Sequence, residues 1–186
     1  QIDEHRDRTR LLKMALDQNP DYLLALDGDE IFMPKSKDIL LEELETIYPD
    51  KSMFQFQFLY IWDELNQFRC DGIFNNSWQN RLMKIKGKPN DLYFKSSQYG
   101  CNFHIGSLPS NAIDYDNAIR SNVKILHYGY FDDKLRSTKF KFYSQNDPNS
   151  HDQDNYRHII SDKSTFSGPR GFEFRTLPDD MFIKDL

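Results

Sequence analysis

Apolar residues recur along the chain with two spacings, one typical of helices and one typical of strands. The clearest strand pattern is 53–62, where Phe and Gln alternate and the apolar side chains fall on one face. Three other segments carry apolar residues at helical spacing; in the last, Leu135, Phe140 and Tyr143 are expected to face inward. The pattern predicts helices over 3–18, 38–48 and 131–145, and strands over 22–27, 53–62, 81–85 and 123–128. The polar stretch 63–76 carries no predicted element, and the tail is expected to pack over the domain.

The acidic end of the first strand organises the rest of the interpretation. An apolar run from Tyr22 ends in Asp27, Gly28 and Asp29, after which apolar residues resume. Because side chains alternate along a strand, we expect Asp27 and Asp29 to point the same way at its carboxyl end. A helix followed by a buried strand is typical of an αβ unit, which predicts parallel pairing here. Ligands bind at that end of the strands in open α/β sheets.

Two carboxylates this close repel each other unless a cation lies between them. Oxygen ligands of this kind suit hard divalent ions such as Mg²⁺ or Mn²⁺, and Gly28 has no side chain to hold off a ligand. The alternative is a polar strand end with two solvated acids. A calcium loop counted from Asp27 fits poorly, because Phe32 stands where such loops need Gly and Asp38 where they need Glu.

Composition narrows the classes of protein that remain. The chain has 186 residues, 28% charged and 38% hydrophobic, which suits one domain with a sizeable core. Its 15 Phe and 10 Tyr exceed what a plain core needs and favour an aromatic-lined site. A net charge of −5 without a basic block argues against nucleic acid as the main partner, and two cysteines are too few for a disulfide framework. No run is long enough for a membrane span and no signal-peptide pattern is present, so the expected location is cytoplasmic, with attachment to a membrane surface left open.

Three segments, in this order, resemble the family 2 glycosyltransferases. The first runs from Arg8-Thr9-Arg10-Leu11 through Pro20 to the Asp-Gly-Asp motif and its Glu-Ile-Phe continuation. The second, Trp78-Gln79-Asn80-Arg81-Leu82-Met83-Lys84, is similar to the family's W-x-x-R-L-F-R strand. The third, 123–131, is similar to the strand that ends in His-Tyr-Gly before the last helix. Together they span most of residues 3–148.

This resemblance implies a fold and an activity. The fold would be α/β, a Rossmann-like mixed sheet of the GT-A type flanked by helices, in a single domain with its core in 1–150 and its tail in 151–186. The activity would be transfer of a sugar from a nucleoside-diphosphate sugar to a hydroxyl acceptor, dependent on Mn²⁺ or Mg²⁺ and inverting. A divalent cation would neutralise the charge that develops on the departing diphosphate.

The resemblance also implies roles for particular residues. Asp29 would hold the metal that bridges the donor's diphosphate, Asp27 would help through the metal or the ribose, and His127 matches the position of a further metal ligand. Further donor contacts are expected from Arg8, Trp78 and Arg81. Transfer to a hydroxyl needs a base near the acceptor, for which the candidates are Asp63, Asp71 and His104.

The chain departs from the family at its front. Family members carry further strands before the helix at Asp3, and those strands bind the nucleobase and ribose. We therefore expect the carboxyl-terminal part of a glycosyltransferase, incomplete at the amino-terminal end, that alone binds donor weakly and turns over poorly. Two alternatives remain open. One is a phosphatase of the haloacid-dehalogenase type with Asp27 as nucleophile, although Ile31 stands where that motif has Thr or Val; the other is a non-catalytic sugar- or nucleotide-binding module.

Overall fold

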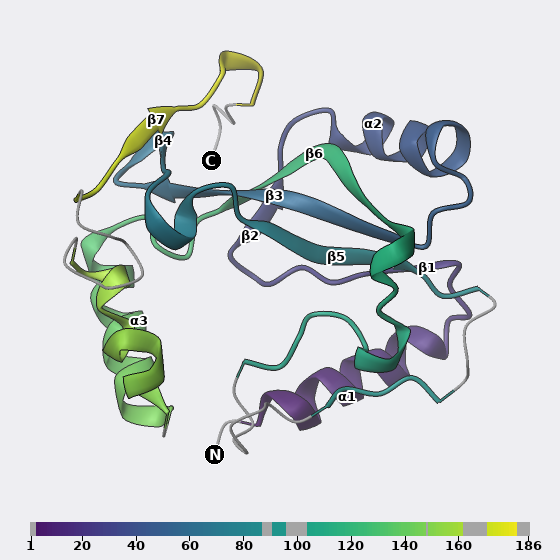
Figure 1. Ribbon diagram of the computed structural model, residues 1–186, viewed down its shortest axis with the longest axis horizontal. Coiled ribbons are helices and arrows are strands. Elements are labelled where there is room, and N and C mark those ends of the chain that lie inside the picture. The colour runs from purple at the N-terminus through teal and green to yellow at the C-terminus, as the bar shows by residue number, and fades with distance from the viewer. Residues whose placement is uncertain (1–2, 87–90, 96–103, 148, 162–170, 182–186) are drawn as a thin grey trace. The chain divides into compact units, whose positions relative to one another are not determined.

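The chain has a mixed α/β fold. The computed structural model describes residues 3–86, 91–95, 104–147, 149–161 and 171–181. The described strands hydrogen-bond into a mixed sheet in the order β1-β5-β3-β4-β7, with β6 paired to both β2 and β3 (Figure 1). The chain divides into two compact units that are interleaved along the sequence. Unit 1 comprises 1–26, 41–56 and 79–121, and unit 2 comprises 27–40, 57–78 and 122–186.

Unit 1 begins with helix α1 (Glu4–Leu16), which its own first turn stabilises. The Asp3 carboxylate accepts a hydrogen bond from the Arg6 backbone N at 2.9 Å, and acidic side chains in the first turn oppose the positive end of the helix dipole. Leu12 is the buried residue of α1, which Figure 1 labels, and it packs with Phe94 and Ile105. The helix predicted over 3–18 is therefore confirmed, slightly shortened.

The strand that follows α1 pairs differently from the prediction. Strand β1 (Tyr22–Leu24) ends at Leu24 rather than at Asp27, and it pairs antiparallel with β5 (Trp78–Lys84). The predicted parallel pairing is wrong here, because the buried side of α1 packs on the Phe94 and Ile105 segments instead of crossing over between neighbouring strands. Leu82 and Met83 of β5 are buried, and Met83 joins Met53 in the core of unit 1.

The second predicted helix, over 38–48, is present, but it changes from α-helical to π-helical hydrogen bonding along its length. Helix α2 (Ser36–Glu42) continues as a π-helical segment, Glu43–Ile47. The buried Glu43 carboxylate accepts a hydrogen bond from the Ser121 hydroxyl at 2.5 Å, which satisfies a polar group inside unit 1.

No helix among the described residues has both the length and the apolar character needed to cross a membrane.

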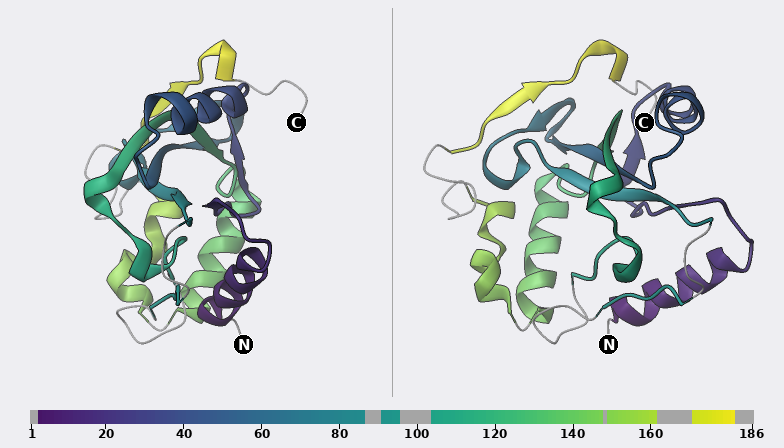
Figure 2. Two further views of the ribbon diagram at one scale, coloured as in Figure 1. Left: turned by 90° about the vertical axis from the view of Figure 1, so that its right-hand side faces the viewer. Right: turned by 45° about the vertical axis from the view of Figure 1, so that its right-hand side comes forward.

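Unit 2 contains three short strands that the sequence pattern did not reveal, β2, β4 and β7. The predicted strand over 53–62 is confirmed as β3 (Met53–Trp62), and that over 123–128 is the end of the longer β6 (Ala118–His127). Polar residues form β4 (Glu64–Arg69), which follows a turn at Asp63 and pairs antiparallel with β3. The remaining strands are β2 (Glu30–Phe32), paired with β6, and β7 (Phe174–Thr176), paired antiparallel with β4 (Figures 1 and 2). The expected packing of the tail as a whole stays a prediction.

Helix α3 (Asp133–Asn146) confirms the last predicted helix, and of the three residues expected to face inward Phe140 and Tyr143 are half-buried whereas Leu135 is not. The Asp132 carboxylate caps it by accepting a hydrogen bond from the Leu135 backbone N at 2.7 Å. Leu135, expected inside, is 42% exposed, whereas Arg136 is 5% exposed and donates to the carbonyl oxygens of Tyr130 and Phe131. Helix α3 packs beside the 3₁₀ segment Ser150–Ile159 (Figure 2).

A buried arginine explains much of the aromatic content of unit 2. Arg69 is fully buried, and its guanidinium donates to both carboxylate oxygens of Asp71 at 2.6 Å and to the His158 carbonyl oxygen at 2.6 Å. The guanidinium also lies 4.7 Å from the Trp62 ring centroid and 4.0 Å from that of Phe172. Several aromatic residues that the sequence suggested for a ligand site thus surround a structural ion pair.

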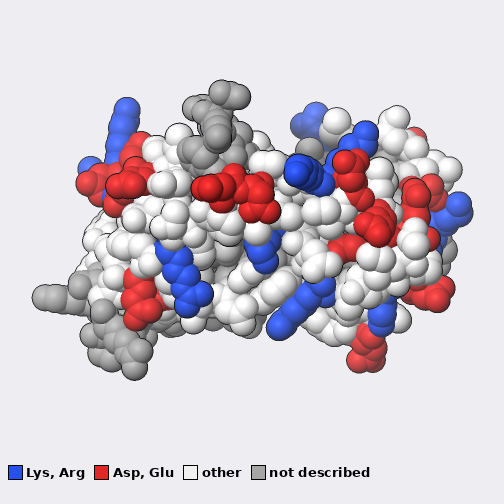
Figure 3. Space-filling model, turned by 90° about the horizontal axis from the view of Figure 1, so that it is seen from above, with Lys and Arg blue, Asp and Glu red and all other residues white. Residues whose placement is uncertain are grey.

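Charge on the surface follows the sequence. On the face shown in Figure 3, acidic and basic side chains are interspersed, as a net charge of −5 without a basic block predicts.

Burial of His158 makes the stability of the fold depend on pH. Burial, and then the charge of Arg69, lowers the pKa of His158 from 6.5 to about 4. Between these values the unfolded chain binds a proton that the folded chain does not, so the free energy of unfolding falls as the pH is lowered from 6.5 to 4. The loss attributable to His158 is about 3 kcal/mol. Urea unfolding at several pH values measures this loss.

His158→Gln should remove the pH-dependent loss of stability between pH 6.5 and 4, whereas the exposed His151→Gln should keep it. Identical pH profiles for the wild type and both variants would contradict this account.

Candidate metal centre

The acidic segment is a turn and not the end of a strand. The Glu30 backbone N donates to the Asp27 carbonyl oxygen at 3.1 Å, and the Asp27 N donates to the Glu30 carboxylate at 3.1 Å. Since β1 ends at Leu24, the alternation of a strand does not apply, and the reason given for a common direction of Asp27 and Asp29 is wrong. Asp27 is exposed, whereas Asp29 is half-buried.

The pairing of β2 with β6 brings Asp29 to His127. Glu30 stands opposite His127 in the register, and the Tyr128 backbone N donates to the Asp29 carbonyl oxygen at 2.8 Å. The Asp29 Oδ2 then lies 3.8 Å from the His127 Nε2. Two segments far apart in the sequence are thus joined by main-chain hydrogen bonds at the point where their polar side chains meet.

Three side chains at this junction could hold a metal ion. Asp29, Glu30 and His127 each offer a ligand atom, and these atoms lie within 4.8 Å of one another. Two carboxylates with one imidazole fit a first-row divalent ion such as Mn²⁺ better than Mg²⁺, which prefers an all-oxygen set. The sequence suggested Asp27, Asp29 and His127 as metal ligands. The group of three found here contains Glu30 and not Asp27.

Lys139 of α3 supplies a positive charge at the same carboxylate. Its Nζ donates to the Asp29 Oδ2 at 2.6 Å and lies 4.8 Å from the Tyr130 ring centroid. Burial alone would raise the pKa of Asp29, but the charge that His127 carries when protonated and the hydrogen bond from Lys139 outweigh it, so the pKa lies below its ordinary value. The Asp29 carboxylate is therefore ionised at neutral pH, and a metal ion at Oδ2 has to share it with the ammonium or displace it.

Gly129 leaves the space that this arrangement occupies. Its backbone N donates to the His127 Nδ1 at 3.2 Å. A Cβ built on Gly129 would overlap the Asp29 Oδ2 and the Lys139 Nζ and would lie 2.6 Å from the His127 Cε1. A neutral imidazole that accepts at Nδ1 carries its proton on Nε2, so a metal at Nε2 requires the other tautomer and loss of the Gly129 hydrogen bond.

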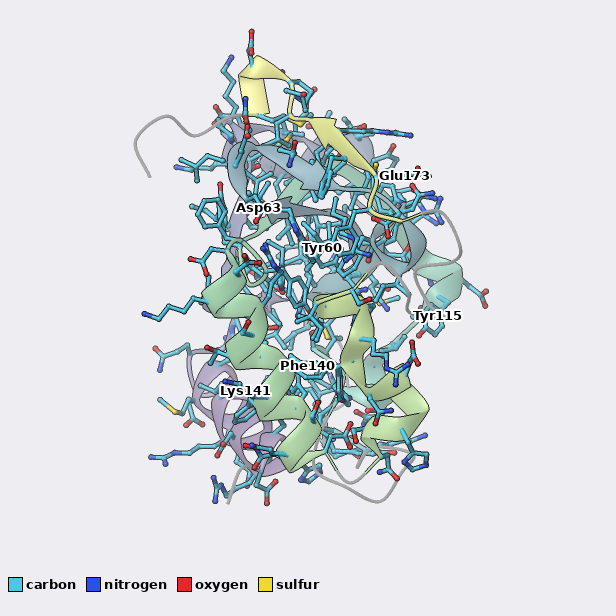
Figure 4. The ribbon with its side chains drawn as sticks, turned by 90° about the vertical axis from the view of Figure 1, so that its left-hand side faces the viewer. Tyr60, Asp63, Tyr115, Phe140, Lys141 and Glu173 are labelled. Atoms are coloured by element: carbon cyan, nitrogen blue, oxygen red, sulfur yellow. The ribbon has the colours of Figure 1, made fainter. Side chains whose placement is uncertain are left out.

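Aromatic rings cover one side of His127. Its ring stacks on Tyr130 with centroids 5.1 Å apart and lies 5.0 Å from the ring of Tyr60, which Figure 4 labels in the interior of this unit. Burial raises the pKa of Tyr130, so its phenol stays neutral and adds no negative charge beside Asp29, Glu30 and His127. The rings exclude water from this side of His127 and leave the Asp29 side for a cation.

The predicted bases lie in three different environments. Asp63, labelled in Figure 4, has a side chain 52% exposed and a positive φ of 61°, and one oxygen accepts from the Arg136 Nη2 at 2.7 Å. Asp71 is buried and bonded through both oxygens to Arg69. His104 is exposed and belongs to unit 1.

The predicted donor contacts are likewise divided. Trp78, in unit 2, is half-buried, and its Nε1 donates to the Asn76 Oδ1 at 2.8 Å. Arg81 is buried in unit 1 and donates to the Ser107 hydroxyl, and Arg8 is half-buried on α1. Arg8, Arg81 and His104 belong to unit 1 and the metal group to unit 2, so their roles at that group stay predictions.

Comparisons with protein-family models, with curated proteins and with solved structures found no match.

Two residues of the site, Glu30 and Lys139, were not among the predicted site residues. Lys139 reaches Asp29 only through the placement of α3, and nothing in its helical pattern marks it. Glu30 directly follows the Asp-Gly-Asp motif, and recognising the motif as a turn would have identified it as a third possible ligand.

Replacing Gly129 by Ala tests the close packing of the group. The new methyl group would push Asp29 and His127 apart, so we expect Mn²⁺ affinity to fall about tenfold or more, as for other changes around metal ligands. Titration calorimetry with Mn²⁺ measures the affinity. Gly106→Ala is the matched control, because a Cβ there meets only the Leu108 carbonyl oxygen at 3.8 Å. Equal Mn²⁺ affinities for the two variants would show that this packing is irrelevant to binding.

Proposed function

We propose that this chain forms the metal-binding part of a glycosyltransferase of the GT-A type, which transfers a sugar from a nucleoside-diphosphate sugar to a hydroxyl acceptor. The observation that supports this most is the approach of Asp29 to His127 at 3.8 Å. The family resemblance implies that these two residues, which belong to separate sequence motifs, bind one metal. Glu30 completes a donor set suited to Mn²⁺.

The residues around the metal group suit a diphosphate leaving group. A bound Mn²⁺ would supply positive charge to the diphosphate as negative charge develops there. Lys139 already contacts the Asp29 Oδ2, and once released from it the ammonium would reach a phosphate oxygen beside the same carboxylate. Tyr60 and Tyr130 keep water from one side of His127, where low polarity strengthens these electrostatic contacts.

Asp63 is the base that the local structure favours. Its backbone N donates a hydrogen bond to the Phe131 carbonyl oxygen at 2.6 Å, which holds Asp63 in place between β3 and β4. A cavity of about 310 Å³ lies beside it, lined in part by Trp62, Arg136 and Phe172, and could admit an acceptor hydroxyl. Asp71 is a weaker choice because Arg69 binds both of its oxygens. Inversion at the sugar follows from the resemblance alone.

Asp29→Asn tests this proposal in the complete chain. Removing the charge of one metal ligand should weaken Mn²⁺-dependent binding of UDP or GDP about a hundredfold and abolish Mn²⁺-dependent release of the diphosphate from its sugar. Calorimetry gives the affinity, and chromatography of the nucleotide products gives the release. Asp50→Asn, an exposed acid of unit 1, is the control and should behave as the wild type.

Three outcomes would contradict the proposal. Diphosphate binding that needs no metal, or that survives Asp29→Asn, would remove the role of the metal group. Tight metal-dependent binding by the wild type without any release or transfer would show a binding module. A phosphoenzyme trapped at Asp27 by a fluoride analogue would show a phosphatase.

A further inference from the structure

A second cavity in unit 2 lies around Lys124. Side chains alternate along β6, so Lys124 and His127, three residues apart, are directed to opposite faces of the strand. Lys124 donates to the Gln57 Oε1 of β3 at 2.8 Å, and both residues line the cavity. The volume is about 270 Å³, close to the lower end of the range for small-molecule pockets.

The walls of this cavity are mostly apolar. Leu59 of β3, Phe68 of β4 and Met181 contribute to the lining, and these three also pack together in a hydrophobic cluster with Leu177. Part of the wall comes from Thr176 and Pro178, in and just after β7, so a ligand here would touch the strand that pairs with β4. Such walls favour a ligand with an apolar body.

The charges that line the cavity are positive. Lys124 and Arg175 belong to its lining, and no Asp or Glu does so among the described residues. The hydrogen bond that Lys124 makes is to a neutral amide, and burial lowers the pKa of its ammonium because lost water has not been replaced by an anion. The buried Cys70 thiol adds no negative charge, since burial raises its pKa. An anionic ligand would supply a negative charge beside the Lys124 ammonium and the Arg175 guanidinium.

We propose that this cavity binds a small monocarboxylate with an unbranched apolar chain. The carboxylate meets the Lys124 ammonium, with Arg175 as the second cation, and the chain packs against Leu59, Phe68 and Met181. A monoanion suits the site better than a phosphate dianion, because the apolar walls would leave most of a second charge without water or a partner. The site does not depend on the proposed transferase activity.

Octanoate and octan-1-ol test the proposal, because they share a chain and differ in charge. Titration of the complete chain by calorimetry should show saturable octanoate binding, with octan-1-ol at least tenfold weaker. Lys124→Met keeps the apolar stem and should weaken octanoate about tenfold or more without changing octan-1-ol. Lys124→Arg should retain octanoate within a few-fold. Lys141→Met, on α3 (Figure 4), removes an exposed charge outside the cavity and should have no effect.

A second measurement does not depend on any variant. Because residues in and just after β7 form part of the wall, bound octanoate should slow hydrogen exchange of the β7 amides in the wild-type chain, and octan-1-ol at the same concentration should do so less. The proposal is overturned if octanoate binding does not saturate, if octan-1-ol binds as tightly, if Lys124→Met binds octanoate like the wild type, or if β7 exchange is unchanged at saturation.

Discussion

The half-buried carboxylate of Asp29 requires positive charge, and unit 2 is arranged to supply it. Three elements meet at this one group: the turn before β2, the end of β6 and the middle of α3. Lys139 contributes the ammonium at 2.6 Å, His127 the imidazole at 3.8 Å, and Gly129 the space that lets both approach. The same demand for charge makes Asp29 a suitable metal ligand, because a divalent ion meets it more fully than one ammonium can. The functional proposal depends on this competition between Lys139 and a metal.

Alternation along two strands separates two kinds of chemistry in unit 2. Tyr60 of β3 packs against His127 of β6, so one face brings aromatic rings to the metal group. Gln57 and Lys124 of the same two strands meet at a cavity with apolar walls. In both places the charged side chain is half-buried, so a ligand of opposite charge would interact with it more strongly than it would with a charge on the open surface. Arg69, in contrast, satisfies its charge inside the protein and serves packing.

The sequence predicted those features that depend on local pattern. Strand β3 was recognisable because Phe and Gln alternate, and α3 because apolar residues recur at helical spacing. Strand β4 escaped because its residues are mostly polar and because its partners are β3, reached through the bend at Asp63, and β7 of the distant tail. The turn at Asp27 escaped because its hydrogen bonds involve the Glu30 side chain, which an apolar pattern does not register. Lys139 could not be predicted, since its role arises only when α3 is placed beside β6.

Pulsed electron paramagnetic resonance on the Mn²⁺-loaded chain tests the central claim most directly. If Asp29, Glu30 and His127 hold the ion, the spectrum should show modulation from one imidazole nitrogen. His127→Gln should abolish this modulation, whereas His151→Gln and His158→Gln should leave it unchanged. A bound Mn²⁺ without nitrogen modulation, or with modulation that survives His127→Gln, would contradict the account.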